Sequence, residues 1–430
     1  MSLENLYSLY KKYKSVTTDS RIVTKNALFF ALKGENFNGN AYAQNALENG
    51  CSYAIIDEKD YAENDKYIVV RNVLETLQKL GNYHRRNLGI PILGITGTNG
   101  KTTTKELISA VLAKKFKLTY TQGNLNNHIG VPLTLLSMDS EMEFGVVEMG
   151  ANHMKEIKQL CEIAEPDYGI ITNIGKAHLE GFGSFENIIK TKKELYDYIK
   201  IKQGKVFFNY NNDILRKGIN ELKLDNIPFG NKDSEVCGEV LNTEQYLSLR
   251  IKIGEFIGEI HSKLVGNYNL ENILAAVSIG NYFNIHPTDI ISAIEKYIPK
   301  NNRSQFIKTS KNNIILDAYN ANPTSVELSV RNFVSLKKEN SFLILGDMLE
   351  LGSESKKEHE NIIKLLQDLN FENVILVGNV YQSLNVPNNY IQFKDVSELK
   401  KWLLENNISK SNVLIKGSRG IRLETIVEFL

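Results

Sequence analysis

The chain has 430 residues, which is too long for one ordinary domain and predicts two or three. Lys and Arg number 51 and Asp and Glu number 50, so the net charge of +1 supplies no bulk field that would favour nucleic acid or an anionic membrane. The three cysteines are widely spaced and form no CxxC pair, which argues against both a disulfide framework and a zinc ribbon.

The first fifteen residues, MSLENLYSLYKKYKS, are polar and carry no signal-peptide core, and no apolar run approaches membrane-spanning length. We therefore expect a soluble, cytoplasmic protein with no nucleic-acid partner and no stable membrane association.

Residues 1–85 alternate short strands and helices and predict a small α/β domain. The expected strands are Ala27–Leu32, Tyr53–Ile56 and Tyr67–Val70, and the expected helices are Tyr42–Glu48 and Val73 to His84. Two polar clusters interrupt this pattern, at residues 17–21 (TTDSR) and 33–39 (KGENFNG). Ordinary cap and turn chemistry accounts for such clusters, although Arg21 beside two hydroxyl groups also suits a diphosphate.

Residues 86–299 open with PILGITGTNGKTTTKELISAVL, in which an apolar strand is followed by a glycine-rich turn and an amphipathic helix. Such a turn points successive N–H groups into one concavity, and the helix dipole adds positive potential there. Lys101 would approach the outer phosphates of a nucleotide, and the Thr102 hydroxyl would ligate Mg²⁺. The spacing is a variant of the phosphate-binding loop, because Ile95 stands where the strict pattern has glycine. A glycine-rich turn alone is a weak signal; the strand, the Lys-Thr pair and the helix together predict nucleotide binding.

Two further apolar runs, Phe144–Met149 and Tyr168–Ile174, carry or lead to Glu148 and His178. The carboxyl ends of parallel strands meet at one edge of a sheet, where ligands gather. A buried Glu148 at such an end suits a metal ion, although a helix-capping glutamate has the same spacing. His178 on spacing alone is typical of a capped loop histidine.

A helix over Phe185–Ile199 places Lys192 as the single charge in an apolar stripe. An unpaired ammonium there is costly, so the sequence leaves two interpretations: a side chain that reaches water, or a modified lysine.

The rest of the chain predicts an antiparallel flap and then a separate doubly wound domain over residues 300–430. Alternation at Leu247–Ile253 and Phe256–Leu264 indicates the flap, and a helix is expected at Asn269–Phe283. Four apolar runs, each followed by a helical pattern, predict parallel strands at Ile314–Leu316, Phe342–Leu345, Val374–Val377 and Val413–Ile415. Pro299 and residues 300–303 read as the linker.

These motifs together resemble the Mur ligase superfamily. The P-loop, Glu148, His178 and a lysine fourteen residues later carry the likeness. Further matching stretches occur in order through all three parts of the chain: TDSR (18–21), FFALKGENFNG (29–39), GNLNNHIGVPLTLL (123–136), EMGANHMKEI (148–157), AHLEGFGSFENIIKTKKEL (177–195), DAYNANPTS (317–325), ILGDMLELG (344–352) and IKGSR (415–419).

The resemblance implies an α/β fold of three domains. They would be a uridine-nucleotide-binding domain (1–85), a central P-loop ATPase domain with a mostly parallel sheet and a small antiparallel sheet (86–299), and a Rossmann-like C-terminal domain (300–430). It also implies an ATP-dependent amide ligase of peptidoglycan precursor synthesis. The ligase would join D-alanyl-D-alanine to a UDP-N-acetylmuramoyl-tripeptide through an acyl phosphate, giving the pentapeptide, ADP and phosphate. Two Mg²⁺ ions, a carbamate on Lys192 and a monomeric chain are expected.

The site residues that the resemblance implies fall into four groups. Catalysis would rest on Lys101, Glu148, His178 and Lys192, and the metal ligands would be Thr102, Glu148, His178 and Lys192. ATP would meet Gly97, Thr98, Asn99, Gly100, Lys101, Thr102, Thr103, Asn269, Asn272, Arg303 and Asp317. The UDP substrate would meet Thr18, Asp19, Ser20, Arg21, Gly34, Asn38, Gly39, Asn124, Asn126 and Asn127. The peptide and dipeptide would meet Tyr319, Asn320, Asn322, Lys416 and Arg419.

Two alternative functions remain at this point. A sister ligase that adds a single amino acid shares most of these motifs, and a non-catalytic nucleotide-binding protein would share the P-loop. A non-catalytic nucleotide-binding protein needs no second metal site, so the presence of His178 and Lys192 together with Glu148 argues against this alternative.

Overall fold

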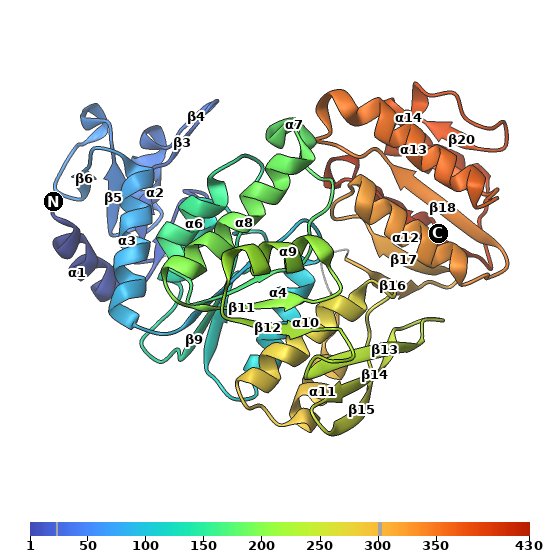
Figure 1. The fold of residues 1–430 in the computed structure, drawn as a ribbon. Coiled ribbons are helices and arrows are strands. Elements are labelled where there is room, and N and C mark those ends of the chain that lie inside the picture. The colour runs from blue at the N-terminus through green and yellow to red at the C-terminus, as the bar shows by residue number, and fades with distance from the viewer. Residues whose placement is uncertain (23–24, 300–302) are drawn as a thin grey trace.

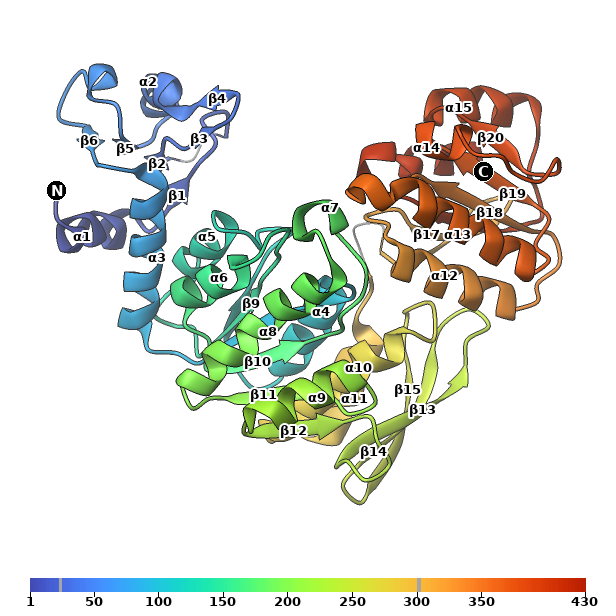
Figure 2. The ribbon, with the colours of Figure 1, turned by 45° about the horizontal axis from the view of Figure 1, so that its top comes forward.

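Three sheets of four, nine and six strands organise the computed structural model, which describes residues 1–22, 25–299 and 303–430. Each sheet carries helices, and the three units follow one another along the chain (Figure 1). The N-terminal and C-terminal units lie at opposite ends of the central one in both ribbon views (Figures 1 and 2).

The N-terminal unit is a parallel sheet in the order β1-β2-β5-β6, and its two faces are covered by different helices. Its elements are α1 (Leu3–Tyr13), β1 (Val16–Thr17), β2 (Leu28–Phe30), β3 (Lys33–Gly34), β4 (Phe37–Asn38), α2 (Ala43–Glu48), β5 (Tyr53–Ile56), β6 (Tyr67–Val69) and α3 (Val73–Leu88). Helices α1 and α3 bury one face, and α2 buries the other. Helix α1 was not predicted because its composition is mostly polar. The structure shows that Leu6, Tyr7 and Tyr10 form a buried stripe along it.

Helix α3 joins the N-terminal and central units. It begins because Asn72 accepts a hydrogen bond from the Glu75 N–H, and it ends at Gly89, whose φ of 64° is left-handed. Since the helix runs to Leu88, the expected boundary at residue 85 falls within its last turn, and α3 packs on α5 (Gly130–Leu136) of the central unit.

The central unit is one nine-stranded sheet in the order β15-β14-β13-β12-β11-β10-β7-β9-β8. Its strands are β7 (Ile92–Thr96), β8 (Leu118–Tyr120), β9 (Phe144–Glu148), β10 (Tyr168–Ile171), β11 (Lys205–Asn209), β12 (Asn226–Phe229), β13 (Val236–Asn242), β14 (Ser248–Ile253) and β15 (Phe256–His261). The expected antiparallel strands exist, and they continue the parallel sheet through a β12–β13 pairing. Strands β8, β12 and β13 were not predicted.

Helices cover both faces of this sheet. One face packs on α4 (Lys101–Leu112), α10 (Asn269–Tyr282) and α11 (Pro287–Lys296). The other packs on α5 (Gly130–Leu136), α6 (Glu156–Ala164), α8 (Phe185–Ile201) and α9 (Asp213–Leu222), and α7 (Leu179–Phe182) precedes α8. Helix α8 begins at Ser184, whose side chain accepts from the Asn187 N–H, and this start fixes the face on which Lys192 lies.

The C-terminal unit is a six-stranded sheet in the order β16-β17-β21-β18-β19-β20, parallel except for β16. Its elements are β16 (Gln305–Lys308), β17 (Asn313–Asp317), α12 (Pro323–Ser335), β18 (Ser341–Gly346), α13 (Ser355–Asp368), β19 (Val374–Val377), α14 (Asn379–Gln382), β20 (Ile391–Phe393), α15 (Val396–Glu405) and β21 (Asn412–Lys416). Helices on both faces confirm the doubly wound architecture. The edge strands β16 and β20 were not predicted, and residues 300–302 of the expected linker lie outside the described residues.

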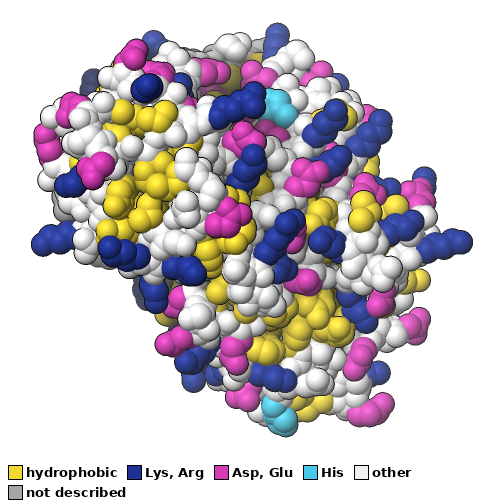
Figure 3. Space-filling view, turned by 90° about the vertical axis from the view of Figure 1, so that its left-hand side faces the viewer, with side chains coloured by type: hydrophobic (Ala, Val, Ile, Leu, Met, Phe, Trp, Pro, Cys, Tyr) yellow, Lys and Arg dark blue, Asp and Glu magenta, His cyan; other side chains and the backbone are white. Residues whose placement is uncertain are grey.

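Charged side chains of both signs are interspersed over the face that carries the N-terminal unit (Figure 3), in keeping with the balanced net charge. No helix in the described part of the chain has the length and apolar character needed to span a membrane.

Candidate active site

The glycine-rich turn links β7 directly to α4, and two of its glycines are sterically required. Gly97 has a φ of 147° and Gly100 a φ of 76°. A Cβ on Gly97 would overlap Thr172 Oγ1, and one on Gly100 would lie 2.6 Å from Asn272 Oδ1. Side chains are therefore excluded at both positions, and the backbone curls as a phosphate-binding turn requires.

Lys101 lies over this turn at the N-terminus of α4. Its Nζ donates to the carbonyl oxygens of Gly97 at 2.8 Å and Thr98 at 3.0 Å. Burial lowers the pKa of Lys101, the charge of Glu148 opposes that shift, and Arg303 adds to it. A lysine side chain and a helix N-terminus thus meet where an anion would bind.

Glu148 ends β9 and is 1% exposed. Its Oε1 accepts from Thr102 Oγ1 at 3.3 Å and from Asn126 Nδ2 at 2.9 Å. Its Oε2 accepts no hydrogen bond and lies 3.6 Å from the Nζ of Lys105, a second lysine that is also 1% exposed.

This arrangement fits a magnesium ion. Oε2 of the buried Glu148 accepts no hydrogen bond among the described residues and faces one cation there, Lys105 Nζ at 3.6 Å, and the Thr102 hydroxyl beside the carboxylate is a further oxygen ligand for a metal ion. Within residues 1–22, 25–299 and 303–430, no group of three or more His, Cys, Asp or Glu side chains is placed to hold a metal. Any ion here would therefore draw on hydroxyl, phosphate or carbamate oxygens as well.

Lys192 is buried on α8 with 3% exposure, as its place in the apolar stripe predicted. Burial, reinforced by the charge of Lys101, lowers the pKa of Lys192 to about 7. Its Nζ lies 5.8 Å from the centre of the Phe182 ring. Both interpretations of Lys192, a side chain that reaches water and a modified lysine, stay predictions.

His178 immediately precedes α7 in a left-handed conformation with a φ of 50°. Its Nδ1 lies 2.5 Å from Oε2 of Glu350, a residue of the C-terminal unit. The two side chains form an ion pair, and among the described residues this nitrogen makes no hydrogen bond with regular geometry.

The C-terminal unit brings two arginines toward the P-loop. Arg303 stacks on Tyr319 at 3.6 Å from the ring centre, and Arg419 lies 5.4 Å from the same ring. Arg303 Nε is buried without a partner, and the charge of this residue lowers the pKa of both Lys101 and Lys105. Asn322 also reaches the P-loop, since its Nδ2 donates to Asn99 Oδ1 at 2.8 Å.

Asp317 and Lys416 are joined to each other, although the resemblance gave them separate roles. Lys416 Nζ donates to Asp317 Oδ2 at 2.5 Å, and the lysine is 2% exposed. Ser329 Oγ donates to the same carboxylate at 3.3 Å. Asn320 is exposed, and its side chain accepts from the Ala321 N–H.

Asn269 and Asn272 are buried together on α10 beneath Gly100. Asn272 Nδ2 donates to Asn269 Oδ1 at 2.8 Å, and Asn272 Oδ1 accepts from Thr104 Oγ1 at 3.0 Å. In this structure they brace α10 against α4; a contact with adenine remains a prediction.

The residues expected to bind a UDP substrate lie in two places. In the N-terminal unit, Arg21 is 87% exposed and pairs with Asp19 at 2.7 Å. Ser20 is buried, and Asn38 caps the turn at Gly39, where a Cβ would overlap the Leu32 carbonyl. Thr18 and Gly34 complete this set.

The loop at residues 123–130 of the central unit holds the other three. Asn127 Oδ1 accepts from the N–H groups of Ile129 and Gly130, in the turn that leads into α5. Asn126 instead meets Glu148, so it belongs to the candidate metal site as the structure places it. Asn124 contributes its carbonyl to the turn before Asn126.

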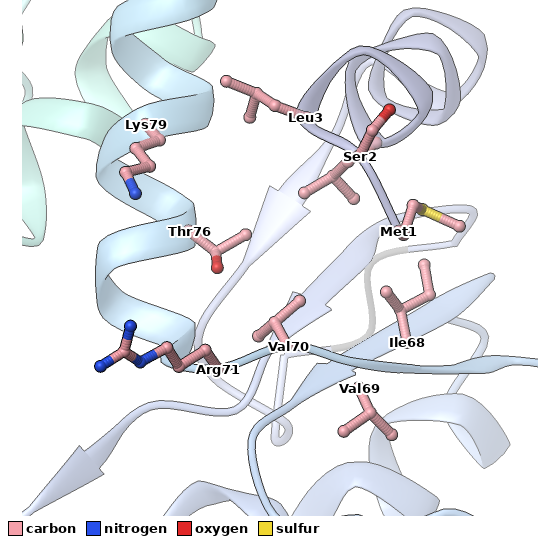
Figure 4. Close-up of a pocket in the computed structure, with 10 residues that line it drawn as sticks. Met1, Ser2, Leu3, Ile68, Val69, Val70, Arg71, Thr76 and Lys79 are labelled. Atoms are coloured by element: carbon pink, nitrogen blue, oxygen red, sulfur yellow. The ribbon is translucent and has the colours of Figure 1, made fainter.

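Two cavities lie outside this site. One, of 520 Å³, is lined by Lys176 and Phe185 of the central unit and by Thr324 and Glu358 of the C-terminal unit. The other, of 330 Å³, lies between the start of α1, β6 and α3, and its lining includes Leu3, Ile68, Val70, Arg71 and Lys79 (Figure 4). The P-loop residues line neither cavity.

Three residues near the site were missed by sequence reasoning. Lys105 is four positions after Lys101 and so shares its helix face, a signal that was available. Glu350 and Glu358 contact the central unit across a domain interface: Glu350 pairs with His178, and Glu358 Oε1 accepts from Lys176 Nζ at 2.9 Å. No local sequence pattern predicts pairings between residues of different domains.

Comparison with known proteins places all three units in one family. The Mur ligase family, catalytic domain model matches residues 12–93, the Mur ligase middle domain model matches 95–280, and the Mur ligase, glutamate ligase domain model matches 302–419.

Among curated proteins, the chain is 33% identical to the UDP-N-acetylmuramoyl-tripeptide--D-alanyl-D-alanine ligase of Bacillus subtilis, over 96% of this chain and 92% of that one. Among solved structures it is similar to MurF from Acinetobacter baumannii, with a TM-score of 0.88, 29% identity, and coverage of 97% of this chain and 93% of that one. It is also similar to the MurF ligase of Thermotoga maritima in complex with ADP, with a TM-score of 0.86, 26% identity, and 97% of each chain covered.

Proposed function

The chain belongs to the Mur ligase family, and from this premise we propose that it uses ATP to join D-alanyl-D-alanine to a UDP-N-acetylmuramoyl-tripeptide. One observation carries the proposal: the P-loop, Lys101 and the buried Glu148–Thr102 pair form one ATP site. The chain that holds this site matches relatives named UDP-N-acetylmuramoyl-tripeptide--D-alanyl-D-alanine ligase or MurF over nearly its full length. The reaction belongs to peptidoglycan precursor synthesis.

The reaction proceeds in two displacements. An oxygen of the tripeptide carboxylate attacks the γ-phosphorus of ATP, ADP leaves, and an acyl phosphate forms. The amino nitrogen of D-alanyl-D-alanine then attacks the acyl carbon and loses a proton, and phosphate leaves as the amide forms. Because both first reactants are anions, the site must mainly position them and neutralise charge.

The chain supplies that neutralisation from two units. Lys101 and the N-terminus of α4 face the phosphates from the central unit, and Arg303, held on Tyr319, approaches from the C-terminal unit. Thr102 and Glu148 would hold Mg²⁺, which supplies further charge neutralisation on the phosphates when bound. Since the cations come from two units, we expect domain closure over ATP to precede chemistry.

We also propose that His178 and a carbamylated Lys192 hold a second ion. Carbon dioxide would add to the neutral amine with loss of one proton and leave an anionic group with two oxygens, which suits Mg²⁺. The support is that Lys192 is buried on the apolar stripe and has no ion pair among the described residues. In addition, no cluster of three or more His, Cys, Asp or Glu side chains among the described residues could hold the second ion without the carbamate.

The remaining roles are proposals from the resemblance. Residues 18–21, 34, 38 and 39 of the N-terminal unit, with Asn124 and Asn127, would anchor the uridine nucleotide. Tyr319, Asn320, Asn322, Lys416 and Arg419 would meet the peptide or the dipeptide, Asn269 and Asn272 the adenine, and Asp317 the ribose. We propose that the protein acts in the cytoplasm as a monomer.

A sister ligase that adds one amino acid is the second candidate, since it would share the same ATP site. To test the assignment, phosphate release is measured with each substrate omitted in turn. We expect release only when Mg²⁺, ATP, the UDP-tripeptide and D-alanyl-D-alanine are all present. Release without any acceptor amine would indicate a simple nucleotidase and refute the proposal.

A further inference from the structure

A loop of the C-terminal unit, residues 347–352, is braced at three points and reaches across the domain interface. Asp347 accepts from the N–H groups of Val380 and Tyr381 at the start of α14, at 2.9 and 3.0 Å. The Met348 N–H donates to Nε2 of the fully buried His359 at 2.9 Å. The Leu349 N–H donates to Ser418 Oγ at 2.9 Å. The loop is therefore rigid up to the residue that follows, Glu350.

The far side of the loop packs on α7, the short helix that begins after His178. The Glu180 N–H donates to the Glu350 carbonyl at 3.4 Å, and Gly352 lies close enough to Glu180 that a Cβ would be 3.2 Å from its side chain. Leu179 packs against the apolar core of the C-terminal unit, which includes Leu351. Backbone and side-chain contacts together hold α7 in a fixed position against the loop.

Glu350 and His178 face each other in unfavourable backbone conformations. Their φ angles are 64° and 50°, and left-handed conformations cost a non-glycine residue about 1 to 2 kcal/mol each. Glu350 is 54% exposed, so its ion contact with the imidazole contributes little stability by itself. The contact is therefore of interest for the position that it gives the imidazole rather than for its stability.

The contact also selects one nitrogen of the ring. Oε2 of Glu350 lies 2.5 Å from Nδ1, which leaves Nε2 as the nitrogen with a free lone pair. A histidine that binds a metal usually gives its second ring nitrogen to a carboxylate or carbonyl, which fixes the tautomer and the ring orientation.

We propose that Glu350 is a positioning residue that holds the imidazole of His178 with Nε2 directed toward the second metal ion. This inference rests on the proposed function for the existence of that ion. It has a structural consequence: the carboxylate belongs to the C-terminal unit and the histidine to the central unit, so docking of the two units and binding of the ion favour each other.

The test is a titration with Mn²⁺, followed by electron paramagnetic resonance, in the presence of a non-hydrolysable ATP analogue. No peptide substrate is used, so the result does not depend on which amide the enzyme forms. We expect two bound ions in the parent chain. In Glu350→Ala the first ion should bind unchanged and the second about 10- to 100-fold more weakly, the range for loss of such a supporting group.

Two further variants give the test its controls. Glu350→Gln keeps an oxygen that can accept from Nδ1 and should restore part of the affinity, whereas a merely structural role predicts no difference between Gln and Ala. Glu354→Ala removes a nearby exposed carboxylate, which pairs with Lys357 in the described part of the chain, and should leave both ions unaffected. A parent chain that binds one ion, or a Glu350→Ala variant that binds the second ion as tightly as the parent or more tightly, would overturn the proposal.

Discussion

Replacing Lys105 by methionine should destabilise helix α4 and the neighbouring strand β9, which carries Glu148. Lys105 Nζ is the one cation within 4 Å of Glu148 in the described part of the chain, and both side chains are 1% exposed. At 3.6 Å their Coulomb attraction is about 5 kcal/mol for an effective dielectric constant of about 20. Removing one partner of a buried pair costs about 3 to 5 kcal/mol, because the other charge is left uncompensated. Methionine keeps the volume, so we expect a loss of about 3 kcal/mol.

The loss should disappear in part when the carboxylate is neutralised as well. In the Lys105→Met/Glu148→Gln double variant the two changes should be non-additive by about 2 kcal/mol, since neither charge remains. Hydrogen exchange of the amides in β9 and α4, without nucleotide or Mg²⁺, gives the local free energy of opening. Lys114→Met, at an exposed position just after α4, is the matched control. A loss below about 0.5 kcal/mol in Lys105→Met, or strict additivity, would refute the reasoning.

Three other outcomes follow from the same structure. His84 donates from Nε2 to the Met138 carbonyl and accepts at Nδ1 from Tyr7, and burial lowers its pKa. The unfolded chain therefore binds more protons than the folded chain as the pH falls. Thermal stability should fall from about pH 7 to pH 5, and it should fall less in His84→Gln. Lys192→Ala should nearly abolish turnover with the fold intact by circular dichroism, and acetate or formate should restore part of it; full activity would exclude the carbamate. Arg21→Ala should raise the KM for the UDP substrate far more than that for ATP, and equal changes would remove the N-terminal unit from uridine binding.

Sequence patterns predicted the elements whose structure depends on residues close together in the chain. The buried strands β7, β9 and β10 read as apolar runs, and Gly97 and Gly100 read as a turn because only glycine fits their backbone. The apolar stripe of α8 likewise placed Lys192 in the interior before any contact was known.

The features that were missed depend on tertiary contacts. Helix α1 is held by Tyr7 and Tyr10 packing beside His84, and the edge strands β8 and β20 have only three residues each. The pairings of Glu350 with His178 and of Asp317 with Lys416 join residues 172 and 99 positions apart, as their numbers show. No periodicity encodes such contacts, and a resemblance names residues without saying which of them touch.

Acceptor specificity tests the central claim most directly. The purified chain is given ATP, Mg²⁺, the UDP-tripeptide and an equimolar mixture of D-alanyl-D-alanine with single amino acids, and the products are weighed by mass spectrometry. The account predicts one new amide product, the tripeptide extended by the dipeptide, with one phosphate released for each product formed. A product extended by a single amino acid in comparable yield would contradict it.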